Sequence, residues 1–322
     1  MTTYWAYCKF EGDEAPWTTA LVENKGICAF SSRNFLLGEN ICIETPLTLV
    51  SGHHPFSQHQ IEEIEKNVSK LSDVDKSAFY AMANSHPSAQ TLAAGIFMTN
   101  SFDMTNRETG AACAMYLAIG RLNHSCSPNA QQSHVPETGE EVLYASRDIA
   151  KDEELNDCYI DLRQKKSDRQ RLLLQDYGFT CQCSACSLDP LDPQYIAEER
   201  QRPEALDLEN KLLEAAEEGE QEVALQYAQN LVSLLLSPTA MPWSARYIPS
   251  AYVYLYHISS SLRMRSRAVD TIREAHRWNL LLQGPLTPDS KRSEQLVRQY
   301  TATNQDSNKK KKKNSKVRTS DS

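Results

Sequence analysis

The spacing of apolar residues changes several times along the chain and divides it into strand-rich and helical stretches. Residues 23–50 hold short apolar runs rich in Val, Ile, Thr and Phe, broken by glycine and proline, which predicts several short strands. Over 60–84, apolar residues recur at helical spacing among Glu, Lys and Asp, which predicts a helical insert. Strand-like and loop-like segments return over 96–160, and a short basic helix is expected over 168–177.

After Cys186 the pattern is helical almost throughout. Paired helices of the expected length resemble tetratricopeptide-like hairpins, although no consensus repeat can be aligned. A helical packing domain without a ligand is the plain alternative. Beyond Pro285 the chain turns polar, and we expect 286–322 to be a disordered basic tail. The expected helices, each with an apolar face, cover 205–217, 221–236, 245–264 and 267–282.

Composition narrows the class of protein. A chain of 322 residues can bury a sizeable core, and we expect two domains. The first 25 residues lack the features of a secretory signal, and no run of about eighteen apolar residues occurs, so we expect a protein that is neither secreted nor membrane-spanning. Nine cysteines in such a chain suit a reducing compartment, in which thiols stay free or bind metal.

Charge is distributed unevenly along the chain. The formal net charge is −8, but residues 301–322 hold six Lys, one Arg and two Asp and carry +5, which leaves −13 on the rest. An acidic body is poorly suited to coat nucleic acid and would attract a lysine-rich peptide. Direct nucleic-acid binding is therefore expected only through the tail. Its run Lys309–Lys313 suits nuclear import as well as it suits a plain solvated segment.

Three motifs follow one another in the strand-rich part and just beyond it. They are the nine residues RLNHSCSPN over 121–129, the eight residues ELNDCYID over 154–161, and CQCSAC over 181–186. Together they resemble the catalytic centre of SET-domain lysine methyltransferases, in particular SMYD-like and fungal SET-domain proteins. The chain has no cysteine over 50–96, and so resembles the fungal proteins that lack the MYND zinc module of the SMYD proteins.

The resemblance implies a cofactor and a catalytic residue. Asn123 and His124 would bind the adenine and amino-acid ends of S-adenosyl-L-methionine, and the ring of Phe179 would cover the cofactor. Tyr159 falls at the family's catalytic tyrosine, whose hydroxyl orients the target amine and touches the cofactor. The implied cofactor-binding residues are Lys25, Gly26, Asn123, His124, Tyr159 and Phe179.

The chain departs from the family pattern at two positions. Residues 25–28 resemble the family's opening Gly-x-Gly turn. Cys28 replaces the second glycine of this turn, where glycine permits close backbone approach. Asp157 stands where the family often has an aromatic residue, two positions before Tyr159, which leaves the number of methyl groups transferred undecided. Asn100 is expected either to line the site or to serve as a simple turn residue.

The cysteine motif predicts a zinc site. Cys181, Cys183 and Cys186 supply three thiolates, and structural zinc needs a fourth ligand from elsewhere. In the SMYD-like branch that ligand is the cysteine of the Asn-His-Ser-Cys segment, here Cys126. Free buried thiols are the alternative. The histidines at 53, 54 and 59 are expected to be solvated loop residues rather than a second metal site.

The expected architecture is therefore α+β: a β-rich SET fold with a helical insert and a post-SET zinc loop, followed by an α-helical domain. The expected function is S-adenosylmethionine-dependent protein-lysine N-methylation, by a monomer in the nucleus or cytoplasm, on a lysine-containing protein or peptide such as a histone tail. The rivals are a catalytically weak scaffold and an accessory methyltransferase of a biosynthetic pathway. The expected boundaries are 18–160 (SET domain, insert about 56–95), 161–188 (post-SET), 189–285 (helical domain) and 286–322 (tail).

Overall fold

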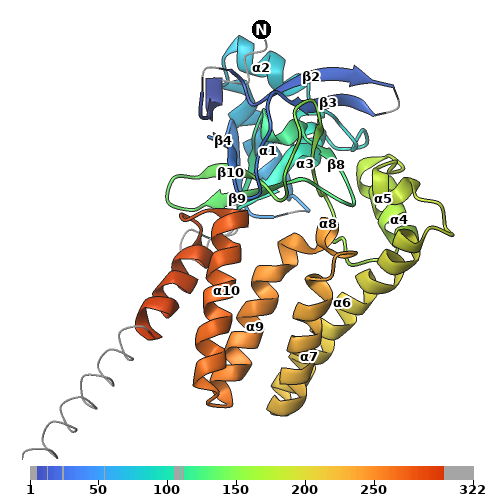
Figure 1. The fold of residues 1–322 in the computed structure, drawn as a ribbon. Coiled ribbons are helices and arrows are strands. Elements are labelled where there is room, and N and C mark those ends of the chain that lie inside the picture. The colour runs from blue at the N-terminus through green and yellow to red at the C-terminus, as the bar shows by residue number, and fades with distance from the viewer. Residues whose placement is uncertain are drawn as a thin grey trace, which may run out of the picture.

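The structure is a computed structural model that describes residues 6–300 except 13, 24, 54, 105–109 and 111. Figure 1 places the strands and the helices α1 to α3 in an upper part, from which the long helices α6, α7, α9 and α10 extend downward. The expected α+β class is confirmed. The basic tail over 301–322 lies outside the described residues.

Three small sheets form the strand-rich part. Their strand orders are β1-β4-β10-β9, β2-β3-β11-β8 and β5-β7-β6, so most neighbours are far apart in sequence. All the pairs are antiparallel except β8 with β11, where two short strands run parallel. The strands are β1 (Cys8–Lys9), β2 (Trp17–Val22), β3 (Gly26–Ser31), β4 (Asn40–Glu44), β5 (Thr48–Ser51), β6 (Ser101–Asp103), β7 (Ala112–Met115), β8 (Asn123–His124), β9 (Ala130–Val135), β10 (Glu140–Ala145) and β11 (Glu154–Asp157).

The helical insert contains three helices with local start signals. Helix α1 (Gln58–Ser69) begins with a capping box between Ser57 and Gln60, and it buries the apolar residues at 64 and 68. Ser72 caps α2 (Asp73–Tyr80). Thr91 caps α3 (Leu92–Asn100), which is buried over most of its length. Strand β6 follows it directly in the chain.

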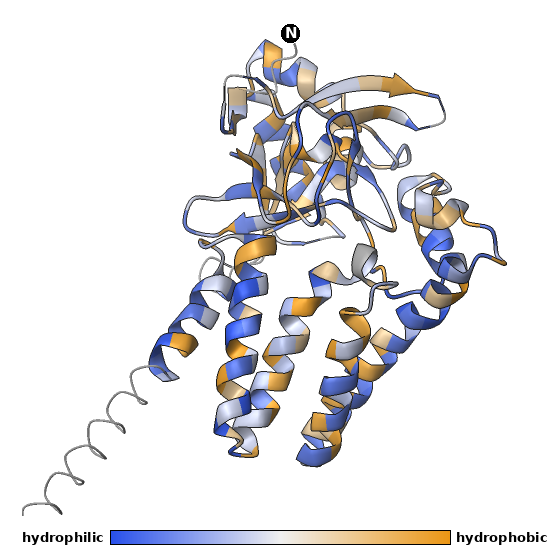
Figure 2. Ribbon diagram, viewed as in Figure 1, coloured by the Kyte–Doolittle hydropathy of each residue, from blue (hydrophilic) through white to orange (hydrophobic). Residues whose placement is uncertain are grey.

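The C-terminal helices are amphipathic, and Figure 2 shows blue and orange residues alternating along them. Their apolar faces share a core with the residues around the cysteine motif, including Cys126, Leu162 and Leu173. A second core fills the strand-rich part. The elements are α4 (Lys166–Tyr177), α5 (Ser184–Ser187), α6 (Pro193–Glu217), α7 (Gln221–Leu235), α8 (Met241–Ser244), η3 (Ala245–Tyr247), α9 (Ile248–Ser261) and α10 (Arg265–Gln283).

Helix α6 is longer than the sequence pattern predicted. It begins at Pro193, whereas we expected a start at residue 205. Asp192 caps it by accepting a hydrogen bond from the Gln194 amide at 2.7 Å, and proline suits the first helical position. Pro203 lies inside the helix, where its missing N–H removes one backbone bond without ending the helix. Tertiary packing of the buried residues on both sides of this proline compensates for the loss.

The polar stretch after Pro285 is a helix over 288–300, so the expectation of a tail beginning at residue 286 was wrong for these residues. Ser290 and Ser293 are almost fully buried, and the Ser293 hydroxyl contacts Asn279 and His276 of α10. Small hydroxyl side chains let this helix pack closely on α10, so a polar sequence is buried here. Tyr300 packs against Tyr256 at its far end. Among the described helices, none is both long and apolar enough to cross a membrane.

Candidate active site and metal centre

The RLNHSCSPN and ELNDCYID motifs meet where β8 runs parallel to β11. Asn123 pairs with Asn156, and His124 pairs with Asp157. Asn129 fixes this crossing, because its side chain donates to the Glu154 carbonyl at 2.9 Å and accepts from the Asn156 amide at 2.8 Å. The two motifs, about thirty residues apart, are thereby locked to each other by backbone and amide hydrogen bonds.

A buried carboxylate that the sequence analysis missed supports the first motif. Glu44, on β4, is fully buried and accepts hydrogen bonds from the amides of Ala118 and Ile119, both at 2.8 Å. Those amides begin the 3-10 turn η2 (Ile119–Arg121) that leads into β8. Burial raises the pKa of Glu44 to about 7, although the backbone donors act in the other direction. No local signal marks this residue, because its partners lie more than seventy residues away.

Tyr159 is held at both its backbone and its side chain. Its amide donates to Nδ1 of His124 at 3.0 Å, and its hydroxyl donates to the Leu122 carbonyl at 2.6 Å. Burial is the main cause that raises the pKa of Tyr159, so the phenol stays protonated at neutral pH. The group that the sequence analysis named as catalytic is thus a neutral, hydrogen-bonded hydroxyl.

His124 is neutral and its tautomer follows from its contacts. Burial lowers the pKa of His124 to about 4. Since Nδ1 accepts from the Tyr159 amide, the proton lies on Nε2, which is 3.3 Å from the sulfur of Cys126. The imidazole therefore links Tyr159 to the cysteine cluster.

Aromatic rings gather around Tyr159. The Tyr159 ring lies 4.8 Å from Tyr177 and meets Phe179 edge-on at 6.4 Å, while His124 lies 6.3 Å from Phe179, all centroid to centroid. Phe179 follows Gly178, whose left-handed conformation (φ 75°) ends α4 and turns the chain back toward the site. Tyr177 was not among the residues expected at the site, although its place at the end of a predicted helix, two residues before Phe179, was a usable signal.

The opening turn forms another edge of the site. Lys25 and Glu154 form an ion pair of 2.7 Å, and Gly26 adopts a positive φ of 78°. Cys28 is buried in β3, and its sulfur receives a hydrogen bond from the Asn123 side chain at 3.2 Å. The residue that replaces the family's glycine therefore contacts Asn123.

These segments surround a cavity of about 1340 Å³. Asn100, on α3, also lines it and is buried, with its amide donating to the carbonyls of Ala83 and Ile96 at 2.7 Å each. The volume exceeds the usual range for one small ligand. The cavity brings together all six residues that the sequence analysis assigned to the cofactor: Lys25, Gly26, Asn123, His124, Tyr159 and Phe179.

Asp157 is an unusual charge beside this cavity. It is 4% exposed, lines the cavity, and accepts a hydrogen bond from the Cys158 amide at 2.7 Å. Burial raises the pKa of Asp157 to about 7, and Arg246 of η3, 3.8 Å away, opposes that shift. A residue of the C-terminal helical part thus reaches the end of β11.

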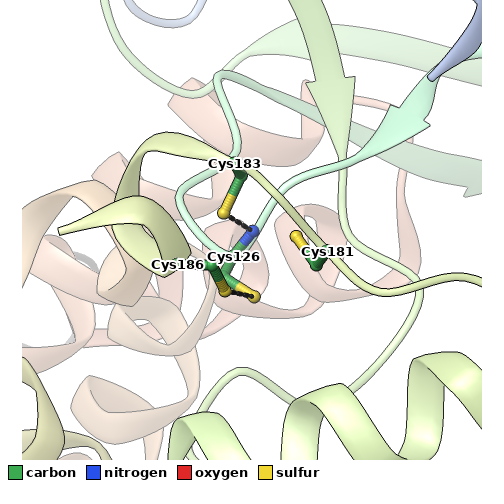
Figure 3. A group of neighbouring side chains, drawn as sticks. All are labelled: Cys126, Cys181, Cys183 and Cys186. Atoms are coloured by element: carbon green, nitrogen blue, oxygen red, sulfur yellow. Dashed lines mark hydrogen bonds between the residues drawn. The ribbon is translucent and has the colours of Figure 1, made fainter. Parts of the chain in front are cut away.

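The four cysteines assigned to zinc converge in space. Figure 3 shows the side chains of Cys126, Cys181, Cys183 and Cys186 pointing toward one another, and their sulfurs all lie within 4.8 Å of each other. The sulfurs of Cys126 and Cys186 are 3.6 Å apart, close to the S···S edge of about 3.8 Å that a tetrahedral Zn–S₄ site with 2.3 Å bonds requires. Thiol contacts lower the pKa of Cys183 and raise that of Cys126. The donor set, its spacing and its burial fit zinc.

Two buried arginines contact Cys126 of this cluster. Arg169 of α4 directs Nε at the Cys126 sulfur at 3.2 Å, which places a positive charge beside the four cysteine side chains. Arg202 of α6 donates to the carbonyls of Cys126 and Leu162, both at 2.9 Å, and pairs with Glu198 one turn earlier. Neither arginine was singled out from the sequence, because a lone arginine on a helix usually faces solvent.

Of the three histidines near residue 55, the structure describes His53 and His59, and these two do not belong to one group of metal-binding side chains. His59 lies on α1, and His54 falls outside the described residues. His53 instead lies next to Asp103 and Cys113, with its Nδ1 2.8 Å from an Asp103 oxygen.

Comparisons with known proteins agree with this geometry. Residues 26–160 match the SET domain family. The histone-lysine N-methyltransferase set5 of Schizosaccharomyces pombe is 30% identical over 181 residues, which are 56% of this chain and 53% of that protein. The N-lysine methyltransferase SMYD2-A of Danio rerio is 26% identical over 250 residues, covering 70% and 53% of the two chains.

Other similarities are shorter or weaker. The human histone-lysine N-methyltransferase SMYD3 is 35% identical over 103 residues, covering 32% of this chain and 24% of that protein. A crystal structure of the SET domain of LSMT bound to lysine and AdoHcy covers 94% of this chain and 91% of its own at 10% identity, but its TM-score of 0.33 is too low to inform function. The chain spans about half the length, or less, of these curated relatives. Residues 26–160 match the SET domain, and parts of the chain are similar in sequence to the SET5 and SMYD lysine methyltransferases.

Proposed function

We propose that the chain is an S-adenosylmethionine-dependent protein-lysine N-methyltransferase. The observation that carries this proposal is that one cavity is lined by all four of the residues Asn123, His124, Tyr159 and Phe179. Its volume leaves room for a cofactor and for the side chain of a target lysine together. The names of the SET5 and SMYD relatives support the same chemistry.

Bound in this cavity, S-adenosylmethionine would supply a methyl group activated by a sulfonium. The ring faces of Tyr159, Tyr177 and Phe179 would lie near that positive charge. The Lys25–Glu154 pair would offer one charge of each sign to the cofactor's amino-acid end. Asn123 would act from β8, where its backbone is fixed by pairing with β11.

Tyr159 would orient the attacking amine. Its hydroxyl is a neutral donor and acceptor whose position is set by the Leu122 carbonyl and by the His124–amide bond. A free lysine has a pKa of about 10.4, so the site must favour the deprotonated amine as well as align it. Burial of the channel around Tyr159 would contribute to both effects.

We further propose that Cys126, Cys181, Cys183 and Cys186 hold one structural zinc ion. The metal would tie the segment that carries Phe179 to the strand that carries His124, because Cys126 lies two residues after His124 and Cys181 two residues after Phe179. Four protein ligands leave no open position, so the role is structural rather than catalytic.

The substrate would be a lysine-containing protein or peptide, such as a histone tail, bound by a monomer. Outside the tail, the chain carries −13 at neutral pH, which favours a basic substrate. Nuclear or cytoplasmic placement is consistent with the relatives named as histone-lysine methyltransferases. These assignments extend to the whole protein and therefore rest on the test below.

The test is to incubate the purified chain with methyl-labelled cofactor and a cell protein extract. We expect label on protein lysines, identified by mass spectrometry, and binding of S-adenosylhomocysteine by calorimetry. His124→Ala should weaken cofactor binding, and His59→Ala, on the exposed surface of α1, should not. Cofactor binding without transfer would favour a scaffold, and no binding at all would reject the cavity assignment.

A further inference from the structure

The register of the β5-β7-β6 sheet brings three different metal-binding side chains to one place. On β7, Cys113 is paired with Val50 of β5 on one side and with Asp103 of β6 on the other. His53 follows β5 by two residues, and its ring contacts the Asp103 side chain. An imidazole, a carboxylate and a thiol therefore meet, although they come from three separate segments.

The distances are those of a group that can close on one ion. The nitrogen, oxygen and sulfur of the three side chains all lie within 4.8 Å of one another, with Cys113 Sγ 3.6 Å and His53 Nδ1 2.8 Å from the same Asp103 oxygen. Tetrahedral zinc with bonds of 2.0–2.3 Å requires edges of about 3.5 Å for S···O and about 3.3 Å for N···O. The S···O distance already fits.

The N···O contact must open by about half an ångström to reach the tetrahedral edge, and the S···N distance lies within 4.8 Å. The His53 and Asp103 side chains can make that adjustment because they are 43% and 67% exposed. The buried Cys113 sulfur, by contrast, is fixed by β7 and lies 3.4 Å from the Gly52 carbonyl. One rigid soft ligand and two adjustable ligands suit capture of an ion from solvent.

The chemistry of the donors selects the ion. Imidazole and thiolate are poor ligands for calcium and magnesium, which prefer oxygen, whereas nitrogen, oxygen and sulfur together suit zinc. On binding, the thiol releases its proton, and the thiolate and carboxylate together balance the two positive charges of the ion. Three protein ligands leave the fourth position to water or to an external group.

We propose that His53, Asp103 and Cys113 bind a second zinc ion at a site distinct from the four cysteines. The ion would bind there whether or not the chain transfers methyl groups. Asp103 also lines the large cavity, together with Pro55 just after His53. The ion would tie the segment after β5 to β6 and β7 and so brace this wall of the cavity. Its open position faces solvent on the side of the two exposed ligands.

The experiment uses the full chain equilibrated with buffered free zinc in the micromolar range, with bound metal measured by mass spectrometry. We expect a second equivalent of zinc that is lost in His53→Ala and in Asp103→Asn, both of which change exposed side chains and should leave the fold intact. His59→Ala and Cys8→Ser are matched controls outside the site and should keep it.

Cobalt substitution gives an independent readout. The second equivalent of cobalt should show a thiolate charge-transfer band weaker than that of the first, because a single cysteine binds it, and Cys113→Ser should abolish that band. A single zinc per chain in the unaltered protein would overturn the proposal, as would a second equivalent that persists in both His53→Ala and Asp103→Asn. The pair at 2.8 Å would then be an ordinary hydrogen bond.

Discussion

At the scale of single residues, the proposed role of Tyr159 can be tested by removing one hydroxyl group. Tyr159→Phe keeps the ring among Tyr177 and Phe179 but removes the hydroxyl that now contacts the Leu122 carbonyl. We expect near-normal folding and cofactor binding, with the barrier to methyl transfer raised by about 2–4 kcal/mol, the size expected for one preorganised polar group. Circular dichroism, calorimetry and a single-turnover assay separate these effects. Full activity would point to another catalytic group.

Asp157 should make stability depend on pH. Its pKa rises from 3.8 in a free side chain to about 7 when folded, so the folded chain binds the proton more tightly than the unfolded chain does. The contribution of Asp157 to the free energy of unfolding is fully present below about pH 4 and is lost as the pH rises through about 7. Glu44, also raised to about 7, acts in the same direction. We expect a decline in the free energy of unfolding between pH 5 and pH 8.

Replacing the carboxyl isolates the share of Asp157. In Asp157→Asn the decline between pH 5 and pH 8 should shrink by about 2–3 kcal/mol, because no proton is released there. Denaturant unfolding at both pH values measures it. Asp270→Asn, on the exposed surface of α10, is the control and should leave the decline unchanged. An equal decline in Asp157→Asn and in the unaltered protein would mean that Asp157 is already ionised at pH 5.

At the scale of elements, we expect the segment between α4 and α6 to depend on the cysteine cluster for its place beside the strands. The segment 178–188 has a single turn of helix of its own, and its buried contacts are mainly the cysteines and Ala185. The metal would therefore replace a hydrophobic core here. Arg169 and His124 both direct N–H groups at Cys126, so loss of the metal should also disturb α4 and β8.

Removal of zinc by a strong chelator should release 178–188 from protection. We expect faster amide hydrogen exchange and faster proteolysis across this segment and loss of methyl transfer. Helices α9 and α10 should stay protected, because a separate apolar cluster that includes Tyr256 and Ile272 also holds them to each other. Adding zinc back should restore all three. Unchanged exchange over 178–188 in zinc-free protein would mean that packing alone holds it.

At the scale of the whole molecule, Arg202 joins parts that are distant in sequence. From α6 it reaches the carbonyl of Cys126, two residues after β8, and that of Leu162, between β11 and α4, and its guanidinium lies 4.9 Å from the Trp243 ring centroid. Its charge is matched by Glu198. The helical domain is therefore held to the strand-rich part by a buried polar contact as well as by apolar packing.

Arg202→Met should destabilise the chain by about 3–5 kcal/mol, because it leaves Glu198 buried without its partner and two carbonyls without donors. Denaturant unfolding measures this value. Arg200→Met, two positions earlier on the exposed side of α6, is the matched control and should cost little. Removing both charges in Arg202→Met with Glu198→Leu should recover part of the loss. No difference between the two single variants would show that the buried pair is energetically neutral.

Much of the molecule could be predicted because its signals are local. Ser57 with Gln60, and Ser72 with Asp75, mark helix starts through atoms three residues apart, and both helices lie in the stretch where a helical insert was expected. The triplet over 181–186 also carries its ligand spacing within six residues. The motif resemblance added Cys126, Tyr159 and Phe179, which the structure places around one cavity and one cluster.

What only the tertiary structure decided depends on contacts between distant segments. Glu44 under the Ala118 amide, Asp157 beside Arg246, and His53 with Asp103 and Cys113 have no local signature, because strand register and helix packing create them. The helix over 288–300 belongs to the same class, since its buried serines gain their partners from α10 rather than from their own sequence. The sequence by itself determined the elements and the chemical motifs, whose signals act over a few residues. Closure of long loops decided which charges and thiols would meet, and that is a property of the folded chain as a whole.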